Sequence, residues 1–245
     1  MLEHLREFGN KLREPVDRAI GKMAEAGLIL RNGKDIPFPS AAVEKPVAQT
    51  PETPVEIPTV SEELYMKTRE ALVKEGYTFV VDIESLSIDQ LAEDPVISQR
   101  FGYVSPSEDM RGIVPPQMEV AINPKNLRIK DSNYKPTDTQ KIMINNEETG
   151  LKDKLPKDVR SLISMRMQNA SVLVQLDDKY QKETGKVLFT DWFGRTDDQT
   201  VPGIVAGVGR FDPADRLDVH DWDRGGGDDY VFAVPVVVLP RKLAV

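Results

Sequence analysis

Residues 187–240, VLFTDWFGRTDDQTVPGIVAGVGRFDPADRLDVHDWDRGGGDDYVFAVPVVVLP, contain the most distinctive composition in this chain. They hold both tryptophans, four of the eight phenylalanines, seven of the sixteen glycines and ten aspartates, but no Glu, Lys, Asn or Cys. A generic solvated surface mixes Glu and Lys with Asp. Short polar residues interleaved with glycine and aromatic residues are typical of loops shaped for recognition. We therefore interpret this stretch as a binding face.

The strongest local pattern is the alternation in the heptapeptide LDVHDWD, which begins at Leu217. In a strand, Leu217 and Val219 fall on one side, while Asp218, His220 and Trp222 fall on the other. The apolar side can pack inward, so the other side is expected to display an Asp, a His and a Trp together. The alternative is that Trp222 is half-buried beneath the last loop.

Ligand-binding residues are expected on this face and in the loops beside it. The candidates are charged or aromatic side chains: Asp212, Asp215, Arg216, Asp218, His220, Trp222, Asp223, Arg224, Asp228, Asp229 and Tyr230. We expect Trp222, Tyr230, Arg216 and Arg224 to be the anchors, since aromatic and Arg side chains dominate binding energies. The expected partner is a protein or other macromolecule, and the acidic residues favour one with basic patches.

No catalytic residue is assigned. The phosphate-binding, zinc-protease and serine-hydrolase motifs G-x-x-x-x-G-K-[ST], H-E-x-x-H and G-x-S-x-G are absent. The glycines at 203–209 and 225–227 are not followed by a predicted helix, which a phosphate cradle requires. His220 has carboxylates nearby, but no Ser or Thr lies in 201–240. The chain is therefore expected to be a non-enzymatic binding protein.

The aspartates between residues 212 and 229 support an alternative function. Carboxylates are the hard oxygen ligands that Ca²⁺ and Mg²⁺ prefer, so this cluster could form a metal-dependent module or hydrolase. The EF-hand pattern is missing, because no Glu closes the loop. A further interpretation is that each Asp bonds the backbone of its own turn. No cofactor is expected, with Ca²⁺ as the alternative, and no metal ligand is assigned.

Composition limits the partners. The 245 residues carry 32 Lys and Arg against 40 Asp and Glu, a net charge of −8, and no basic cluster stands out, so nucleic acid is not expected. Without cysteine, disulfides and thiolate metal sites are excluded. The longest apolar run, 231–239, is too short to span a bilayer, and no signal-peptide pattern is seen. We expect a soluble, cytoplasmic protein with no membrane partner, while a place in a phage particle or in surface display stays open.

Three segments are predicted. Residues 1–33 have apolar side chains at helical steps of three and four, and this helical segment could pair with itself in a homo-oligomer. Residues 34–60 contain six prolines and are expected to be a disordered, semi-rigid linker. Residues 61–245 are expected to form an α+β ligand-binding domain, in which 187–240 supplies the face rich in Asp, Gly and aromatic residues.

Within the domain, Ser61 is expected to cap a helix that ends near Gly76. A second helix is predicted to start at Pro156 and to run to about Met167. SVLVQL, residues 171–176, has the pattern of a buried strand. VFAVPVVVL, residues 231–239, is expected to be the closing core strand, with Pro235 at an edge or a bulge. From residue 187 on we expect only strands and loops.

Four motifs resemble the C-type lectin-like fold found in the variable proteins of diversity-generating retroelements. They are DWFGRTDDQ (191–199), GVGRF (207–211), LDVHDWDRGGGDDY (217–230) and the VFAVPVVVL ending. The resemblance implies a C-type-lectin-like mixed α+β body with a strand-and-loop C-terminal part. It also implies a ligand-binding face whose residues vary on an invariant scaffold.

In that family, variation arises at template adenines, often in Asn codons, and Asp, His, Tyr, Gly and Arg lie one or two adenine changes away from such codons. The resemblance therefore implies the following variable positions: Asp212, Asp215, Asp218, His220, Asp223, Arg224, Gly225, Gly227, Asp228, Asp229 and Tyr230. The sequence departs from sugar-binding lectins, because it has no Cys and no Glu-Pro-Asn.

Overall fold

The structure, a computed structural model, describes residues 56–243 except residue 202, residues 212–215 and the side chains of 199–201. The predicted N-terminal helix and most of the predicted linker lie outside these residues. All helices and single helical turns of the described residues lie before β6, the strand that begins at Phe193. They are α2 (Glu62–Lys74), α3 (Ile88–Glu93), η1 (Ser98–Arg100), α4 (Glu108–Arg111), α5 (Thr137–Lys154), α6 (Lys157–Arg160) and α7 (Ala170–Thr184). None of these helices has the length and apolar character needed to cross a membrane.

The strands complete an α+β fold, as the sequence predicted. They are β1 (Thr59–Val60), β2 (Phe79–Ile83), β3 (Phe101–Val104), β4 (Met118–Ile122), β5 (Ser164–Arg166), β6 (Phe193–Val201), β7 (Ile204–Gly209), β8 (Leu217–Asp223), β9 (Val231–Phe232), β10 (Val236–Val238) and β11 (Arg241–Lys242). In the described part of 187–243 only strands and loops occur, which confirms that expectation.

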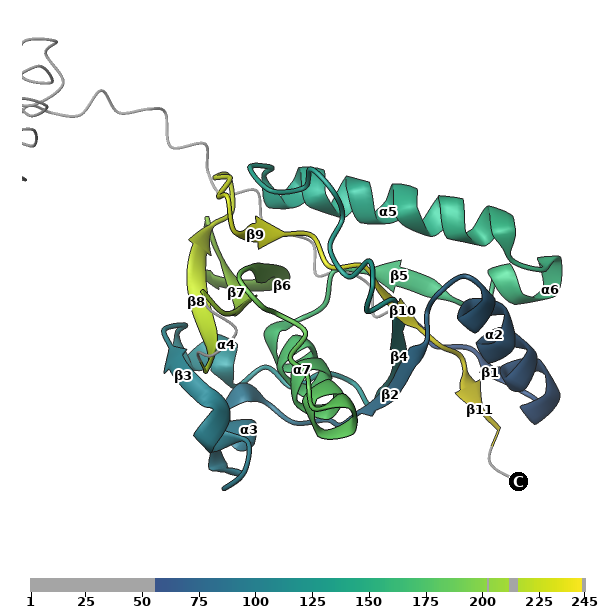
Figure 1. Cartoon of the computed structure of the whole chain (residues 1–245), viewed down its shortest axis with the longest axis horizontal. Coiled ribbons are helices and arrows are strands. Elements are labelled where there is room, and N and C mark those ends of the chain that lie inside the picture. Colours follow the sequence, from purple (N-terminus) through teal and green to yellow (C-terminus); the bar gives the residue numbers. More distant parts are fainter. Residues whose placement is uncertain (1–55, 202, 212–215, 244–245) are drawn as a thin grey trace, which may run out of the picture. The chain divides into compact units, whose positions relative to one another are not determined.

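The strands form two main sheets and one short pair (Figure 1). One sheet is antiparallel, with the order β2-β4-β10-β5. The other has the order β3-β8-β7-β6-β9, and its outer pairs β3–β8 and β6–β9 are parallel. β1 and β11 pair in parallel, so Thr59 and Val60, at the end of the predicted linker, hydrogen-bond within the folded domain.

Helix α7 packs between the two main sheets (Figure 1). Asn169 caps its N-terminus by accepting a hydrogen bond from the Val172 amide at 3.1 Å, and Gly185 ends it in the left-handed conformation with φ +72°. Residues 170–178 are all buried. The prediction of a strand at 171–176 was therefore wrong, because a helix buried on every side loses the apolar periodicity that would identify it.

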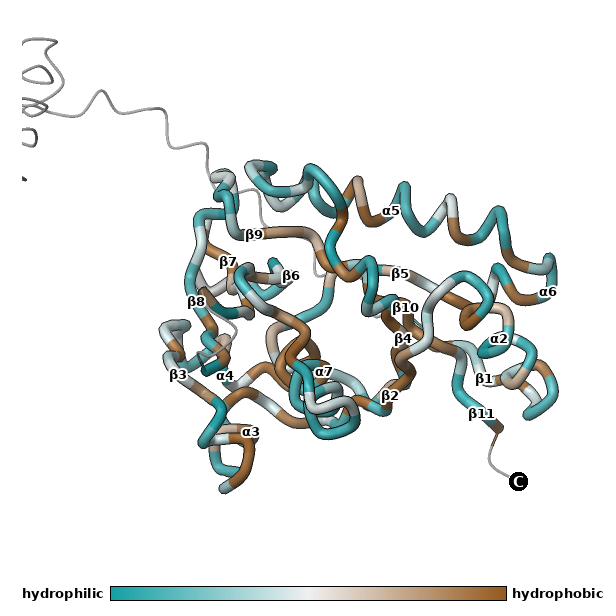
Figure 2. Tube along the Cα trace, viewed as in Figure 1, coloured by the Kyte–Doolittle hydropathy of each residue, from teal (hydrophilic) through white to brown (hydrophobic). Residues whose placement is uncertain are grey.

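The four-stranded sheet is buried on both faces. On β10, Val236 and Val238 pack toward α7, while Val237 faces α2, α5 and α6. Side chains of the neighbouring strand β4 also alternate between the two faces, with Val120 toward α7 and Ala121 on the other side. Figure 2 shows this sheet among the most hydrophobic parts of the trace, whereas α5 is largely hydrophilic.

The run 231–239 does not form one closing strand, which corrects that expectation. It contributes β9 to the five-stranded sheet and then β10 to the four-stranded sheet. Pro235 lies directly before β10, where its missing N–H breaks no ladder bond. β10 itself pairs on both sides and is not an edge strand. A single apolar run thus crosses from one sheet to the other.

The helix predicted from Ser61 to Gly76 is confirmed, whereas the helix predicted from Pro156 to Met167 is wrong. Ser61 caps α2, and its side chain accepts a hydrogen bond from the Leu64 amide at 3.4 Å; the helix is followed by Gly76, with φ +93°. The helix expected from Pro156 stops at Arg160 after one turn. Met165 instead lies in β5, opposite Val237, where sheet pairing and burial override the helical pattern.

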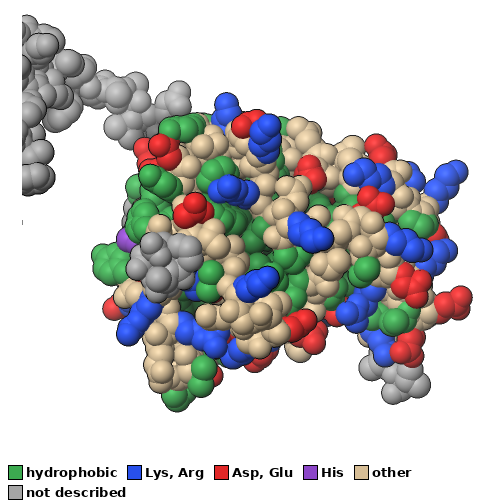
Figure 3. Space-filling model, viewed as in Figure 1, with side chains coloured by type: hydrophobic (Ala, Val, Ile, Leu, Met, Phe, Trp, Pro, Cys, Tyr) green, Lys and Arg blue, Asp and Glu red, His purple; other side chains and the backbone are tan. Residues whose placement is uncertain are grey.

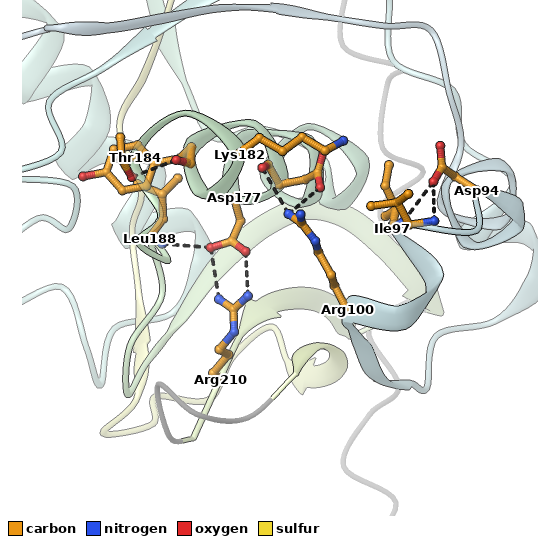
Figure 4. A network of polar contacts seen from close by, with 11 residues as sticks. Asp94, Ile97, Arg100, Asp177, Lys182, Thr184, Leu188 and Arg210 are labelled. Carbon is orange, nitrogen blue, oxygen red and sulfur yellow. Dashed lines mark hydrogen bonds and ion pairs between the residues drawn. The ribbon is translucent and has the colours of Figure 1, made fainter.

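A buried ion pair fixes α7 to the five-stranded sheet (Figure 4). Arg210, directly after β7, donates to both carboxylate oxygens of Asp177 on α7, at 3.0 and 2.6 Å, and both side chains are 2% exposed. The Leu188 amide donates to Asp177 at 2.9 Å, and Arg210 also donates to the carbonyl oxygen of Phe189 at 3.1 Å. Each charge therefore has several partners away from water.

Replacing one member of this pair should be strongly destabilising. Arg210→Met leaves the Asp177 carboxylate buried without its cation, and we expect a loss of about 3–5 kcal/mol in the free energy of unfolding. Lys67→Met, which removes a half-exposed pair with Asp158, should cost less than about 1 kcal/mol. Urea unfolding measures both. A loss at Arg210 as small as the loss at Lys67 would show that the pair does not hold the two elements together.

Asp198 on β6 lies at the other end of α7. Its carboxylate accepts a hydrogen bond from the amide of Ala170, the first residue of that helix, and the residue is 7% exposed. Burial raises the pKa of Asp198 from 3.8 to about 7, the hydrogen bond from Ala170 opposes this rise, and the charge of Asp197 adds to it. The ionised form is therefore unfavourable in the folded state.

This raised pKa predicts a stability that falls with pH. The unfolded chain ionises Asp198 at its ordinary pKa near 3.8, so the folded state binds the extra proton between that value and about 7. The contribution is complete below the unfolded pKa and is lost as the pH rises through 7. In urea unfolding at about pH 5 and pH 8, Asp198→Asn should abolish a component on the order of 2–4 kcal/mol. An unchanged pH profile in this variant would contradict the assignment.

Candidate functional site

Six ring side chains meet on the side of the five-stranded sheet that faces away from α7. They come from all parts of this sheet and are here called the aromatic face: Tyr103, Phe193, Phe211, His220, Trp222 and Tyr230. Strand alternation produces this arrangement. On β8, Leu217 and Val219 are buried against the core, whereas His220 and Trp222 point outward and are partly exposed. The alternation predicted for LDVHDWD is confirmed, whereas the expectation that Trp222 is displayed as an anchor is corrected, because this ring is only partly exposed.

Phe193 is the centre of the aromatic face. This side chain is fully buried, and its ring lies 4.8 Å from that of Phe211, 5.5 Å from His220 and 5.5 Å from Trp222, measured between centroids. The rings meet edge to face or tilted, which is the favourable geometry for aromatic pairs. The surrounding rings thus cover Phe193 and are held in place by it.

The outer rings are exposed to solvent. Tyr103 is 55% exposed, Phe211 54% and Tyr230 49%. Tyr103 lies 5.0 Å from His220, and Phe211 lies 6.3 Å from Tyr230, so the exposed rings are continuous with the buried centre. Figure 3 shows hydrophobic side chains gathered beside a histidine at the left edge of the molecule. Contiguous exposed apolar patches are uncommon on protein surfaces, so this joined group of rings is the candidate functional site.

Glycines on β7 make room for these rings. Gly207 pairs with His220 across the sheet, and a Cβ at Gly207 would lie 2.6 Å from Nε1 of Trp222. The five-membered ring of the indole therefore lies close to bare backbone, and its Nε1 is buried without a hydrogen-bond partner. A Cβ at Gly209 would lie 2.2 Å from the carbonyl oxygen of Trp192. Glycine is required at both positions because ring and backbone approach the strand so closely.

Asp218 and His220 add polar groups at one side of the face. One carboxylate oxygen of Asp218 accepts a hydrogen bond from the Tyr103 amide at 2.7 Å. The other lies 3.6 Å from Nε2 of His220. Asp218 thereby joins β3 to β8, so the position of the exposed Tyr103 depends on it.

The other predicted ligand-binding residues do not form one acidic cluster. Asp223 and Asp228 each accept a hydrogen bond from a backbone amide two residues on, from Gly225 at 2.8 Å and from Tyr230 at 2.9 Å. These are the turn bonds that the sequence offered as the alternative for such aspartates. The predicted positions Arg216 and Asp229 are exposed, whereas Asp212 and Asp215 lie outside the described residues.

Arg224 is tied to α5 rather than free to reach a ligand. Its guanidinium lies 2.7 Å from Asp138, and its carbonyl oxygen accepts from the backbone amide of Thr137 at 3.0 Å. Within the described residues, no group of three or more His, Asp or Glu side chains is placed to hold a metal ion. The aspartates that the structure describes are thus spread over turns and strand edges.

Arg195 holds the turn beside the aromatic face. The residue is 1% exposed and donates to the carbonyl oxygens of Asp223 at 3.0 Å and Gly226 at 3.1 Å, and to Oγ1 of Thr137 at 3.0 Å. Burial lowers the pKa of this guanidinium, and the nearby carboxylates of Asp223 and Asp228 partly offset the effect. Sequence reasoning missed Arg195, because nothing in DWFGRTDDQ separates a buried arginine from an exposed one.

Sequence reasoning also missed three of the six rings. Phe193 and Phe211 lie in the quoted motifs DWFGRTDDQ and GVGRF, where alternation with the inward-facing Trp192 and Arg210 could have placed them. Tyr103 lies far from the others in sequence, and only the parallel pairing of β3 with β8 brings it to the face. No local signal identifies it.

Comparisons of this chain with protein-family models, with curated proteins and with solved structures found no match. The function is therefore argued from the geometry of the aromatic face.

Adding a methyl group beneath Trp222 should disturb the aromatic face. Gly207→Ala places a Cβ against the indole, so we expect a changed tryptophan emission spectrum and a loss of about 1–3 kcal/mol in the free energy of unfolding. Gly150→Ala is the matched control, because nothing lies within 4 Å of a Cβ at this position in α5. This variant should leave the tryptophan emission unchanged and raise the free energy of unfolding by up to about 1 kcal/mol. Equal changes in emission and stability for the two variants would contradict the close packing of Trp222 on Gly207.

Proposed function

We propose that this chain is a non-enzymatic recognition protein that binds a macromolecular partner, most simply a protein segment, through the aromatic face. The observation that carries the proposal is the continuity of three exposed rings, Tyr103, Phe211 and Tyr230, with the packed Phe193 beneath them. Large rings on rigid strands supply contact area at a low entropy cost, which is how recognition surfaces obtain affinity.

Polar residues around the rings support the same function. Asp218 lies on the same side of β8 as His220 and is partly exposed, and Asp229, next in sequence to Tyr230, lies in the turn after β8 and is exposed. An apolar centre with a charged rim is the usual anatomy of a protein interface. The partner is therefore proposed to present aromatic or aliphatic side chains flanked by Lys or Arg, and its association rate should fall with added salt.

The C-type lectin-like resemblance supports a display function in particular. Asp218, His220 and Tyr230 are among the positions that the resemblance implies are variable, and they lie on or beside the aromatic face. Changes there would alter the surface, while Val219 and Leu217 behind them keep the core intact. Our proposal is therefore a variable-type binding surface on a constant scaffold, as in the variable proteins of diversity-generating retroelements.

Selection of binding peptides from a random library tests this function. The library would be displayed on phage and selected on the full chain, and the affinity of enriched peptides measured by titration calorimetry. The triple variant Tyr103→Ser, Phe211→Ser, Tyr230→Ser should weaken this binding by about 100-fold or more, because aromatic anchors carry most of an interface's affinity.

The control variant also removes three exposed apolar side chains. Met66→Ser, Val73→Ser and Ile142→Ser replace exposed side chains on α2 and α5, far along the chain from the aromatic face. This variant should bind the selected peptides within about threefold of the unmodified chain. Equal losses in the two triple variants would mean that general surface hydrophobicity, not the aromatic face, captures the peptides.

A further inference from the structure

A second concave site lies on the opposite side of β6 from the aromatic face. The hollow has a volume of about 710 Å³ and lies between the loop 124–133, the segment 187–192 and β9. Trp192 and Phe232 form its apolar wall, whereas Phe193, the next residue along the chain, faces the other way. The volume is within the range of small-molecule sites, about 300–1,000 Å³.

Three cationic side chains line this hollow in an otherwise acidic chain. Lys125, Arg128 and Lys130 all contribute to its surface, and Asp131 is the one acid among the lining residues. The whole chain carries a net charge of −8. Within the part of the chain that the structure describes, none of the three cations forms an ion pair. Three cations around one carboxylate leave an excess of positive charge, which creates a local positive potential that attracts an anion.

Arg128 is held in position by the aromatic wall. Its guanidinium carbon lies 4.8 Å from the ring centroid of Phe232 and 5.8 Å from that of Trp192. Both distances are within the range of cation–π interactions. A guanidinium packed on rings loses little further freedom when it binds a ligand, and its planar N–H groups match the oxygens of a phosphate in pairs.

We propose that this hollow binds a small phosphorylated ligand. Arg128 contacts the phosphate through paired N–H groups, while Lys125 and Lys130 add charge from the same loop. The rings of Trp192 and Phe232 orient Arg128 and border the remainder of the ligand. The site is independent of the proposed recognition function, since it uses the inward-facing Trp192 and none of the six side chains of the aromatic face.

Titration calorimetry with pyrophosphate and the full chain tests the site. We expect saturable one-site binding that weakens with added salt, and a change in tryptophan emission, because Trp192 lines the hollow. Arg128→Gln should lower the affinity for pyrophosphate about tenfold or more. Arg128→Lys keeps the charge but loses the paired N–H geometry. Its affinity for pyrophosphate should therefore lie between those of the unmodified chain and Arg128→Gln. Lys157→Gln on α6 makes the same charge change as Arg128→Gln outside the hollow and should change the affinity by less than about twofold.

Two results would overturn the proposal. One is the absence of saturable binding by the unmodified chain up to about 10 mM pyrophosphate. The other is an equal loss of affinity in Arg128→Gln and Lys157→Gln, which means that the whole surface attracts anions non-specifically. The triple variant of the aromatic face should keep its affinity for pyrophosphate, so the two proposed sites can fail separately.

Discussion

The Asp177–Arg210 ion pair is the interaction on which the arrangement of this domain depends. Two buried charges of opposite sign are tolerated only when they face each other with further hydrogen bonds, and this pair has partners at Leu188 and Phe189. It fixes α7, the helix between the sheets, to the end of β7. Because Arg210 points inward, the next residue, Phe211, points outward onto the aromatic face. One polar contact in the core therefore positions an exposed ring.

The five-stranded sheet uses strand alternation to build two different surfaces. Its inward side chains, such as Val219 and Trp192, pack toward α7 or line the cationic hollow, while its outward rings form the aromatic face. Gly207 lets Trp222 lie close to the backbone, and Arg195 holds the neighbouring turn. These supports lie beneath or beside the exposed rings.

Some of this arrangement could be predicted from the sequence, and the rest could not. The LDVHDWD alternation was informative because one side of β8 is buried and the other is not. The segments 171–176 and 231–239 misled because burial on every side, or on both faces of a sheet, removes periodicity. Tyr103 could not be placed because it reaches the face through long-range pairing of β3 with β8. The predicted N-terminal helix lies outside the described residues.

The central claim is that the exposed rings of the aromatic face serve binding and not folding. The most direct measurement is the free energy of unfolding in urea of the Tyr103→Ser, Phe211→Ser, Tyr230→Ser variant against the unmodified chain. All three side chains are about half exposed, so we expect the two values to agree within about 1 kcal/mol. A loss of more than about 3 kcal/mol would show that these rings are part of the core, and the account of a recognition surface would be contradicted.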